Sequence, residues 1–356
     1  MWRSKSFRYG KGSVRYPLTV MTKLSDYTTL KVGGTARELV HAQSEQELIA
    51  AVEAADAAGK KVLILGGGSN LLVADEDFDG VVIKVENHGN SYEIDACSGG
   101  MLQVSAGDNW DEFVAFTLSK GLANLESLSG IPGTVGGAPI QNIGAYGHEV
   151  SEVIARVRAY DRVNKEIKTF AVADCDFSYR SSKFKKEAGR YVILDVTFQL
   201  RRGVESLPIQ YAELAAELGA SIGDRVDTAK VREAVLKLRS KKGMVEGIVN
   251  SAGSFFTNPI ISAEKAATLP DDAPRWPQAD GRVKTSAAWL MEHAGVSKGD
   301  THGGASISAL HVLALTNHDN ATAVDLIALA RQAQSKVKEK FGITLEPEVQ
   351  FVGVKL

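Results

Sequence analysis

The feature that most constrains this chain is a long glycine-rich segment in its middle, residues 129–147, which reads SGIPGTVGGAPIQNIGAYG. A flexible linker is rich in glycine and serine and is polar. This segment instead carries Ile131, Val135, Ile140 and Ile143, whose apolar side chains favour burial. We therefore expect its backbone to pack against something flat, for which a flavin ring is a natural candidate.

A second glycine cluster, residues 66–70 (GGGSN), follows the apolar run 62–65. Glycines at such a junction let backbone N–H groups approach phosphate oxygens closely. The cluster is not a dinucleotide-binding fingerprint, because Leu71 stands where the third glycine is needed, and it lacks the Gly-Lys-Ser/Thr of a P-loop. Taken alone, it fits a phosphate-binding loop and an ordinary strand-to-turn junction equally well.

Length and charge set the broad class of the protein. The chain has 356 residues, of which 44% are hydrophobic and 24% charged, so we expect a folded protein of two or three domains. The 41 Lys and Arg residues against 43 Asp and Glu give a net charge of -2. No overall field attracts the molecule to nucleic acid or to an anionic membrane, so we expect neither as a partner.

Cysteine usage and hydropathy bear on the compartment. Cys97 and Cys175 lie far apart and show no CxxC spacing, so neither a disulfide framework nor a zinc site is indicated. No apolar run approaches the roughly 20 residues of a membrane helix, and the N-terminus lacks the apolar core of a signal peptide. These features predict a cytoplasmic protein.

Local patterns outline the secondary structure. Ser44 and Glu47 form a capping box that predicts a helix ending at Gly59, directly before the buried strand at 62–65. In the middle of the chain, the apolar runs 153–160 and 166–172 flank a hairpin turn, and another strand is expected over 192–200. Helical periodicity marks residues 109–119, 228–240, 286–294 and 321–340, with Asp108, Thr285 and Asn320 as expected caps.

Five motifs carry a resemblance to a known family. They are LGGGSN (65–70), the segment 129–147, FSYRSSKFK (177–185), GSFFTNP (253–259) and LEPEV (345–349). In this order they resemble the MurB family, the UDP-N-acetylenolpyruvoylglucosamine reductases, over residues 22 to the C-terminus. Several separated motifs in the correct order are far more specific than any one of them.

The resemblance implies an α+β architecture. A flavin-binding fold of the vanillyl-alcohol-oxidase (PCMH-type) superfamily would be followed by a C-terminal α+β substrate-binding domain. We expect a basic N-terminal arm at 1–21, a first FAD-binding subdomain at 22–88, a second at 89–238 joined by the C-terminal residues 341–356, and a substrate-binding domain at 239–340.

The resemblance also implies the reaction. NADPH would reduce a non-covalently bound FAD, and the reduced flavin would convert UDP-N-acetylglucosamine enolpyruvate to UDP-N-acetylmuramate, a step of peptidoglycan precursor synthesis. No second nucleotide-binding motif is visible for NADPH, which fits the use of one pocket by both substrates in turn. We expect a monomer.

Three residues match the family's catalytic positions. Hydride addition to the enolpyruvyl group builds negative charge, which a fixed cation stabilises, and Arg180 resembles the family's arginine for that task. Glu348 resembles the carboxylate that holds it, and Ser254 resembles the acid that protonates the enolate carbon. Without the motifs, a surface ion pair and a serine capping a turn would be the default interpretations.

The resemblance gives two further sets of residues. Those expected to bind the cofactor are Gly66, Gly67, Gly68, Ser69, Asn70, Ile131, Pro132, Gly136, Gly137, Ile140, Ile143, Gly144 and Arg239. Those expected to bind the substrate are Tyr146, Tyr179, Tyr211, Lys242, Asn258 and His311.

Some of these assignments separate subclasses or have competitors. Tyr211 resembles the tyrosine of a mobile loop that closes over the diphosphate in one subclass, and Lys242 resembles its lysine partner, with Lys241 as a rival. His311 stands where some relatives have glutamine, and Gln350 where some have arginine. The other histidines show no paired ligand spacing, so we expect no catalytic metal.

Two alternative functions stay open at this point. The first is an FAD-dependent oxidase of the same superfamily, although residues 66–70 offer no His or Cys for covalent flavin attachment. The second is a non-catalytic regulator that binds a flavin or a nucleotide sugar. The joint presence of Arg180, Ser254 and Glu348 favours the reductase over both.

Overall fold

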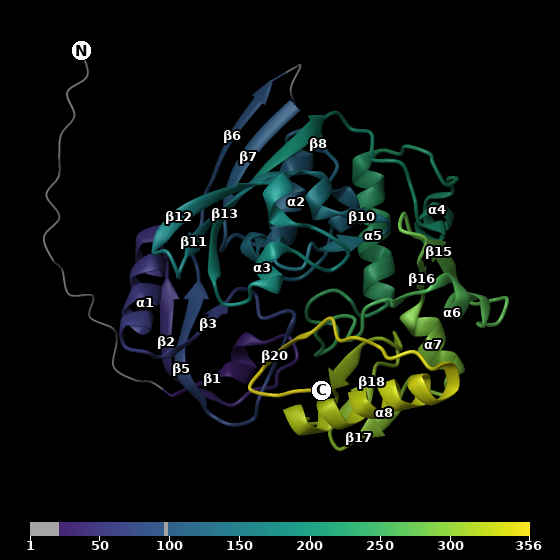
Figure 1. Ribbon diagram of the computed structural model, residues 1–356. Coiled ribbons are helices and arrows are strands. Elements are labelled where there is room, and N and C mark those ends of the chain that lie inside the picture. The colour runs from purple at the N-terminus through teal and green to yellow at the C-terminus, as the bar shows by residue number, and fades with distance from the viewer. Residues whose placement is uncertain (1–20, 96–98) are drawn as a thin grey trace, which may run out of the picture.

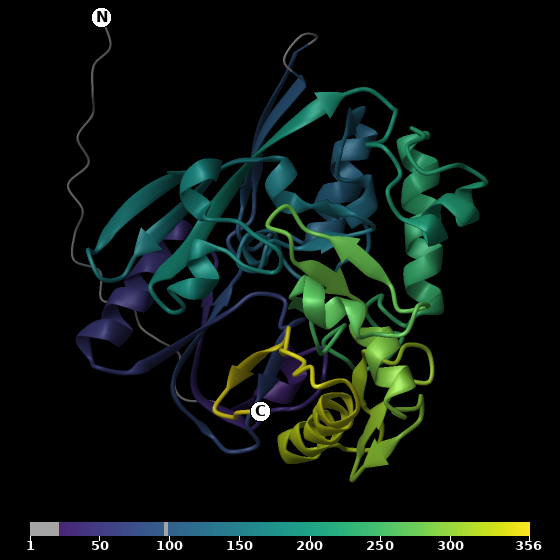
Figure 2. The same cartoon turned by 45° about the vertical axis from the view of Figure 1, so that its right-hand side comes forward.

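The computed structural model describes residues 21–95 and 99–356 (Figure 1). The basic arm expected at 1–21, apart from its last residue, and Cys97 lie outside these ranges. Helices and strands are mixed throughout, so the α+β class is confirmed. In both views the yellow C-terminal part of the chain lies at the end of the molecule opposite the strands β6 and β7 (Figures 1 and 2).

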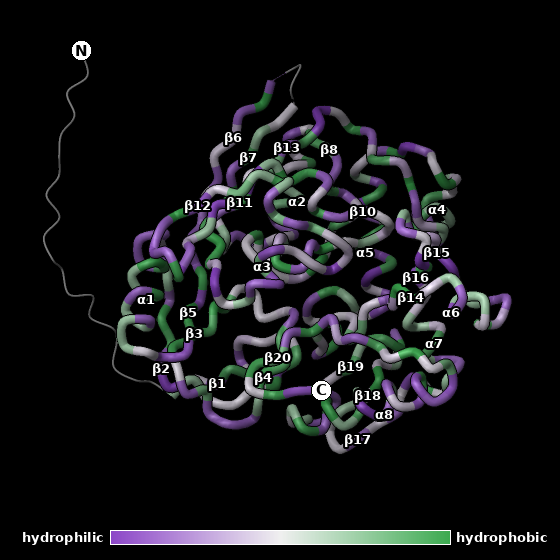
Figure 3. The backbone as a smooth tube through the Cα atoms, viewed as in Figure 1, coloured by the Kyte–Doolittle hydropathy of each residue, from purple (hydrophilic) through white to green (hydrophobic). Residues whose placement is uncertain are grey.

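The first unit is a four-stranded sheet with one covering helix. Its strand order is β1-β2-β5-β3, and β2, β5 and β3 run parallel. The elements are β1 (Thr22–Lys23), β2 (Thr35–Ala42), α1 (Glu45–Ala57), β3 (Lys61–Leu65) and β5 (Phe78–Val85). Helix α1 packs against β2, β3 and β5, and hydrophobic residues dominate β3 and β5 (Figure 3).

Ser44 is confirmed as the N-cap of α1, but the reciprocal bond of a capping box goes to the preceding residue, Gln43, and not to Ser44. The Ser44 hydroxyl accepts a hydrogen bond from the backbone N–H of Glu47 at 3.2 Å, and the Glu47 carboxylate accepts one from the N–H of Gln43 at 2.8 Å. The apolar residues on one face of α1, which include Leu48 and Val52, are buried against the sheet. The strand that follows therefore delivers residues 66–70 to one end of the sheet.

The second unit is an antiparallel sheet of order β12-β11-β13-β7-β6, with β8 also on β13. Its elements are β6 (Asn90–Asp95), β7 (Gly99–Ser105), α2 (Trp110–Ser119), β8 (Leu122–Ala123), β11 (Ile154–Asp161), β12 (Glu166–Ala171) and β13 (Tyr191–Arg202). The hairpin predicted around residues 161–165 is confirmed, since Asp161 pairs with Glu166. Helix α2 is capped by Asn109 and not by the expected Asp108, whose carboxylate instead accepts from the N–H of Gly89.

The remaining elements form a helical pair and a third unit. The helical pair is α4 (Ala212–Leu218) and α5 (Thr228–Lys241). The third unit contains β14 (Ile260–Ile261), α6 (Ala263–Ala267), β15 (Arg275–Pro277), β16 (Val283–Thr285), α7 (Ala287–His293), β17 (Thr301–His302), β18 (Ala305–Ile307), β19 (Leu315–Asn317) and α8 (Ala323–Phe341). The caps of α7 and α8 are Ser286 and Thr322, so the caps expected at Thr285 and Asn320 are wrong by one and two residues.

The C-terminal residues return to the first unit. Strand β20 (Gln350–Val352) pairs in parallel with β4 (Leu71–Val73), whereas the expectation joins residues 341–356 to 89–238. Figure 3 shows the two segments side by side. The Asp75 carboxylate also accepts hydrogen bonds from the N–H of Ala323 at 2.8 and 2.9 Å, which ties the start of α8 to the same unit. This arrangement places residue 348 beside the first glycine cluster. The domain boundaries at 88, 238 and 340 stay predictions.

Candidate active site

A cavity of about 1160 Å³ lies where the first unit, the 129–147 segment and the C-terminal residues meet. Both glycine clusters line it, and so do Arg180, Arg239, Ser254 and Glu348. Residues as far apart in the sequence as Gly66 and Glu348 thus share one wall. The parallel pairing of β20 with β4 is what brings the C-terminal part of this wall into place.

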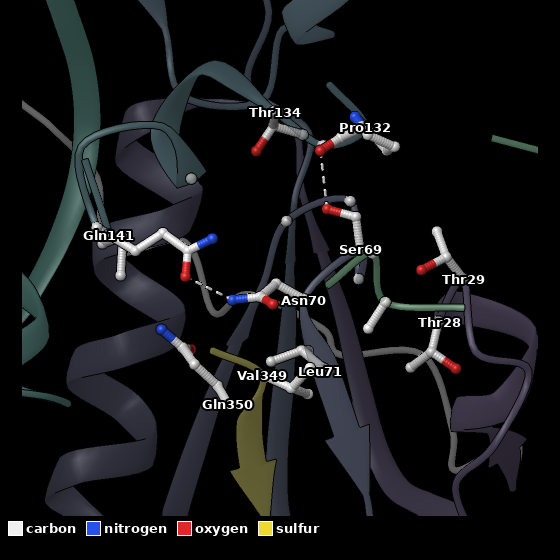
Figure 4. Close-up of a pocket in the computed structure, with 18 of the residues that line it drawn as sticks. Thr28, Thr29, Ser69, Asn70, Leu71, Pro132, Thr134, Gln141, Val349 and Gln350 are labelled. Atoms are coloured by element: carbon white, nitrogen blue, oxygen red, sulfur yellow. Dashed lines mark hydrogen bonds between the residues drawn. The ribbon is translucent and has the colours of Figure 1, made fainter. Parts of the chain in front are cut away.

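The two glycine clusters contact each other at the cavity wall (Figure 4). The Ser69 hydroxyl donates to the carbonyl oxygen of Pro132 at 2.9 Å, and the Asn70 amide donates to the Gln141 side chain at 2.7 Å. A Cβ on Gly67 would lie 2.7 Å from the Gly133 Cα atom. The two backbones therefore approach more closely than any side chain permits.

The 129–147 segment is packed, as its apolar residues predict. Val135 and Ala138 are buried in the main core, and Ile131, Ile140 and Ile143 pack against it. Backbone hydrogen bonds fix the segment further, including Gly136 N–H to the Ala106 carbonyl at 2.9 Å and Trp110 N–H to the Gly133 carbonyl at 3.1 Å. The segment is a rigid part of the wall.

Arg180 and Glu348 form an ion pair in this wall. Arg180 Nε lies 2.8 Å from Glu348 Oε1, and Arg180 Nη2 donates to the Gly144 carbonyl at 2.7 Å. The two side chains are only 18% and 14% exposed. Burial opposes the charge of the guanidinium, but the attraction of Glu348 outweighs it, so the pKa of Arg180 lies above its ordinary value. The arginine is a fixed cation whose remaining guanidinium edge can meet a ligand.

The backbone of Arg180 is held in an unusual conformation. Its φ is 51°, in the left-handed region, within a tight turn in which Ser178 and Ser181 exchange two hydrogen bonds of 3.0 Å. Lys185, on the short helix α3 (Lys183–Lys186), donates to the Arg180 carbonyl at 3.0 Å. Lys185 lines the cavity and was not among the predicted site residues.

Ser254 lies in a turn attached to the Glu348 backbone. The Glu348 N–H donates to the carbonyl of Phe255, the residue after the serine, at 2.8 Å. Gly253, just before the serine, has a φ of 73°, a conformation that only glycine adopts readily. Phe255 and Phe256 are buried beneath the turn, which leaves the half-buried serine at the cavity wall.

Two more cations lie along the cavity. Arg239 donates to the carbonyls of Gly130 at 3.1 Å and Met244 at 2.8 Å, and burial lowers its pKa. Lys84, which the sequence did not point to, donates to the Gly66 carbonyl, and burial lowers its pKa as well. Both place positive charge beside the glycine clusters.

A second group of predicted residues lies beside the cavity, around the C-terminal end of α5. The rings of Tyr146 and Tyr211 meet edge to face at 5.7 Å, and Lys242 forms an ion pair with Glu213. Burial raises the pKa of Tyr146 to about 12. Burial, with help from Lys242, lowers the pKa of His311 to about 4. The structure thus gathers Tyr146, Tyr211, Lys242 and His311 into one cluster, next to the wall that carries Arg180.

Tyr179 and Asn258 line a smaller pocket of about 490 Å³. The Tyr179 hydroxyl accepts from the Asn258 N–H at 3.3 Å, and burial raises the pKa of Tyr179. Lys284 Nζ lies 4.7 Å from the centre of the Tyr179 ring, and Arg180 Cζ lies 5.2 Å from it. Sequence reasoning missed Lys284, because a lysine in a three-residue strand carries no pattern that distinguishes it from a surface charge.

Comparisons with known proteins identify the family. The family profile described as "UDP-N-acetylenolpyruvoylglucosamine reductase, C-terminal domain" matches residues 245–352, and the one described as "FAD binding domain" matches residues 36–169. The UDP-N-acetylenolpyruvoylglucosamine reductase of Cutibacterium acnes is 51% identical over 337 residues, covering 93% of this chain and 89% of that protein. The chain belongs to the UDP-N-acetylenolpyruvoylglucosamine reductase family.

Further relatives of the UDP-N-acetylenolpyruvoylglucosamine reductase family agree with this assignment. The reductase of Thermobifida fusca is 49% identical over 348 residues, covering 94% of this chain and 97% of that protein. The crystal structure of the reductase (MurB) from Thermus caldophilus matches with a TM-score of 0.66 at 26% identity, over 94% of this chain and 98% of that one. The flavin-binding unit followed by the family's C-terminal domain is therefore confirmed.

The cavity suits the FAD expected of this family. Its volume accommodates a large dinucleotide, and its glycine-lined part lets backbone N–H groups approach a diphosphate. A Cβ on Gly68 would lie 1.9 Å from the Tyr27 carbonyl oxygen, so this close backbone approach depends on glycine. Arg239 and Lys84 supply positive charge, while the isoleucines of the 129–147 segment supply apolar surface.

The described residues also bear on metals and membranes. Across 21–95 and 99–356, no three His, Cys, Asp or Glu side chains come close enough together to hold a metal ion. Over the same ranges, no helix combines the length and the hydropathy of a membrane span.

Proposed function

We propose that this chain reduces UDP-N-acetylglucosamine enolpyruvate to UDP-N-acetylmuramate with NADPH, in the synthesis of peptidoglycan precursors. The observation that carries the proposal is the Arg180–Glu348 ion pair, 2.8 Å long, in the wall of a cavity that Ser254 and both glycine clusters also line. FAD, bound there without a covalent link, supplies to the substrate the hydride that it accepts from NADPH.

Arg180 stabilises the charge that develops on the substrate. Hydride addition to the terminal enolpyruvyl carbon puts negative charge on the neighbouring carbon and its carboxylate. A buried guanidinium that is already oriented by Glu348 and the Gly144 carbonyl meets this charge without first reorganising. Glu348 thus acts through Arg180 and keeps its planar group in one orientation.

Ser254 donates the proton that completes the reaction. The enolate carbon needs an acid, and a hydroxyl held on a turn at the cavity wall is a suitable donor. The hydrogen bond between the Glu348 N–H and the Phe255 carbonyl fixes the position of the Ser254 turn relative to the Arg180–Glu348 ion pair. We assign Arg180, Ser254 and Glu348 as the catalytic set.

The cofactor is held by the two glycine clusters. Residues 66–70 and Gly136, Gly137 and Gly144 contribute backbone groups, while Ile131, Pro132, Ile140 and Ile143 contribute apolar contacts and Arg239 contributes a charge. All of these residues line the cavity of about 1160 Å³. A glycine-lined wall with a nearby cation matches the needs of a dinucleotide diphosphate.

The substrate diphosphate binds at the end of α5. Lys242 supplies the charge, and Tyr211 supplies a hydroxyl from a loop that closes over the diphosphate. We propose on this basis that the chain belongs to the tyrosine-loop subclass. Tyr146 and His311 lie in the same cluster, while Tyr179 and Asn258 bind the substrate from the neighbouring pocket. We further propose that the protein works as a monomer in the cytoplasm, with the domain boundaries given above.

An anaerobic two-step experiment tests this function. The FAD-loaded protein is reduced with NADPH, and UDP-N-acetylglucosamine enolpyruvate is then added while the flavin absorbance is followed. Rapid reoxidation by this compound, and none by UDP-N-acetylglucosamine, is the expected result. A reduced flavin that persists with both compounds would remove the substrate assignment and favour the oxidase or the regulator.

A further inference from the structure

Two glutamates of α4 bind three lysines near the end of α5. Glu217 pairs with Lys237 and with Lys241, the latter at 3.1 Å, and Glu213 pairs with Lys242. The two helices also share a small apolar core, to which Leu214 of α4 contributes. The Glu217 pairs and the Glu213 pair join the same two helices, but their lysines differ in solvent exposure and in the residues around them.

The Glu213–Lys242 pair lies among the residues that we assign to the substrate. Lys242 caps the C-terminal end of α5 and precedes Gly243, which lines the large cavity. Its charge also contributes to the low pKa of His311. Lys237 and Lys241 are 58% exposed, whereas Lys242 is 30% exposed. The one lysine proposed to bind the diphosphate is therefore already engaged by a carboxylate.

Glu213 is coupled through the first turn of α4 to Tyr211, the tyrosine of the proposed mobile loop. Tyr211 immediately precedes α4, and its carbonyl accepts a hydrogen bond from the Ala215 N–H at 2.9 Å within the first turn of that helix. Glu213 lies in the same turn. When Glu213 changes its partner, the first turn of α4 can therefore shift Tyr211, the side chain proposed to cover the diphosphate.

We infer that Glu213 competes with the substrate diphosphate for the ammonium group of Lys242 and so determines how strongly the free site attracts phosphorylated ligands. The inference rests on the proposed role of Lys242. A diphosphate carries more charge than a carboxylate and replaces it at the ammonium group. The exchange costs little, because a partly exposed ion pair contributes little to stability. Glu213 is a specificity-determining residue that never touches the substrate.

The experiment compares Glu213→Gln with Glu217→Gln, a matched change one turn along α4. Each FAD-loaded variant is assayed for kcat and for the KM of UDP-N-acetylglucosamine enolpyruvate, and UDP affinity is measured by titration. Glu213→Gln removes the competitor, so KM and the UDP dissociation constant fall about two- to fivefold while kcat stays within about twofold. Glu217→Gln leaves both constants unchanged.

Lys242→Met separates this inference from the proposed function. If Lys242 binds the diphosphate, Lys242→Met raises KM. Adding Glu213→Gln to Lys242→Met then leaves KM unchanged, because the ammonium group for which Glu213 and the diphosphate compete is absent. A raised KM in Lys242→Met together with an unchanged KM in Glu213→Gln would overturn the inference and leave the role of Lys242 standing. An unchanged KM in Lys242→Met would remove that role, and the inference with it.

A shortened carboxylate controls for the fold. Glu213→Asp keeps the charge near Lys242, so KM stays closer to that of the unmodified protein than in Glu213→Gln. Should Glu213→Gln not fold, Glu213→Ala tests the same exchange, because Glu217 and the apolar core still hold α4 in place. A fall in KM that is as large in Glu213→Asp and in Glu217→Gln would show a general loosening of α4 and contradict the competition.

Discussion

At the scale of single residues, the shape of the Arg180 guanidinium matters as much as its charge. Its Nε faces Glu348 and its Nη2 faces the Gly144 carbonyl, so two fixed acceptors orient one planar group. A lysine has one charged atom on a flexible stem and cannot reproduce this fork. The left-handed backbone of Arg180 adds a second constraint on where the group points.

Arg180→Lys tests this reading of the ion pair. We expect kcat to fall about 10²- to 10³-fold, the usual effect of losing one oriented donor to a developing anion. Reduction of the flavin by NADPH should stay nearly normal, and stopped-flow absorbance separates the two steps. Arg37→Lys, which alters an exposed pair with Asp79, is the control and should leave both steps unchanged. Equal losses in both steps would argue for damage to the cofactor site.

Single residues were predictable where a motif carried them. Arg180, Ser254 and Glu348 could be named because each lies in a motif that resembles one of the family's, and without the motifs none of the three would stand out. Lys84, Lys185 and Lys284 could not, because their proximity to the site arises from pairing between distant strands and from a four-residue helix. Nothing near Lys84 or Lys284 distinguishes them from the many lysines on the surface. Lys185 does lie in the motif 177–185, but nothing in the motif separates it from Lys183 as a residue of the site.

At the scale of elements, the site depends on the contact between the two glycine clusters. Ser69 and Asn70 bridge the first cluster to the second, and the Gly67 and Gly133 backbones nearly touch. The same Asn70 side chain donates to the Glu348 carbonyl at 3.2 Å, which joins both clusters to the C-terminal residues. The cofactor wall and the catalytic ion pair therefore form one connected structure.

Gly67→Ala tests this contact. The added methyl group would lie 2.7 Å from the Gly133 Cα atom, so one backbone must move. We expect the affinity for FAD to fall at least about tenfold, because the backbone groups that face the cofactor move with it. The measurement is a fluorescence titration of FAD into the flavin-free protein. Gly59→Ala, beyond α1, is the control. It strains its own left-handed backbone but has no atom within 4 Å of the new methyl group, so the affinity for FAD should be retained.

Elements were predictable where the signal was local. The start of α1 at the Ser44 cap and the hairpin of β11 and β12 follow from a capping residue and a turn, both encoded within a few residues. The pairing of β20 with β4 joins residues nearly 280 positions apart, and three-residue strands carry too little pattern to reveal it. The helix caps were predicted at Thr285 and Asn320 and lie at Ser286 and Thr322, because neighbouring Ser, Thr and Asn residues are all suitable N-caps.

At the scale of the whole molecule, His311 links the substrate cluster to stability. Its Nδ1 accepts a hydrogen bond from the Leu313 N–H at 3.0 Å, which only the neutral ring can do. Burial and the charge of Lys242 lower its pKa to about 4, from an ordinary value of 6.5. Below about pH 6.5, His311 binds a proton in the unfolded chain but stays neutral in the folded protein until the pH approaches 4. The free energy of unfolding therefore falls as the pH falls from about 6.5 towards 4.

His311→Gln should reduce this loss. Between about pH 7.5 and pH 5, the unmodified protein loses about 2 kcal/mol more of its free energy of unfolding than the variant does. Urea unfolding of the FAD-loaded proteins at both pH values gives the comparison. His318→Gln, which alters an exposed histidine, should lose as much as the unmodified protein. Parallel losses in all three proteins would mean that His311 is not the group responsible.

The role of Ser254 as the proton donor is the most direct test of the proposed reaction. Stopped-flow absorbance of FAD-loaded Ser254→Ala measures flavin reduction by NADPH and, separately, reoxidation by UDP-N-acetylglucosamine enolpyruvate. We predict a normal first step and a second step slowed about 10²- to 10⁴-fold, because only the second needs the serine proton. Equal slowing of both steps, or no slowing of the second, would contradict the assignment of Ser254 as the acid.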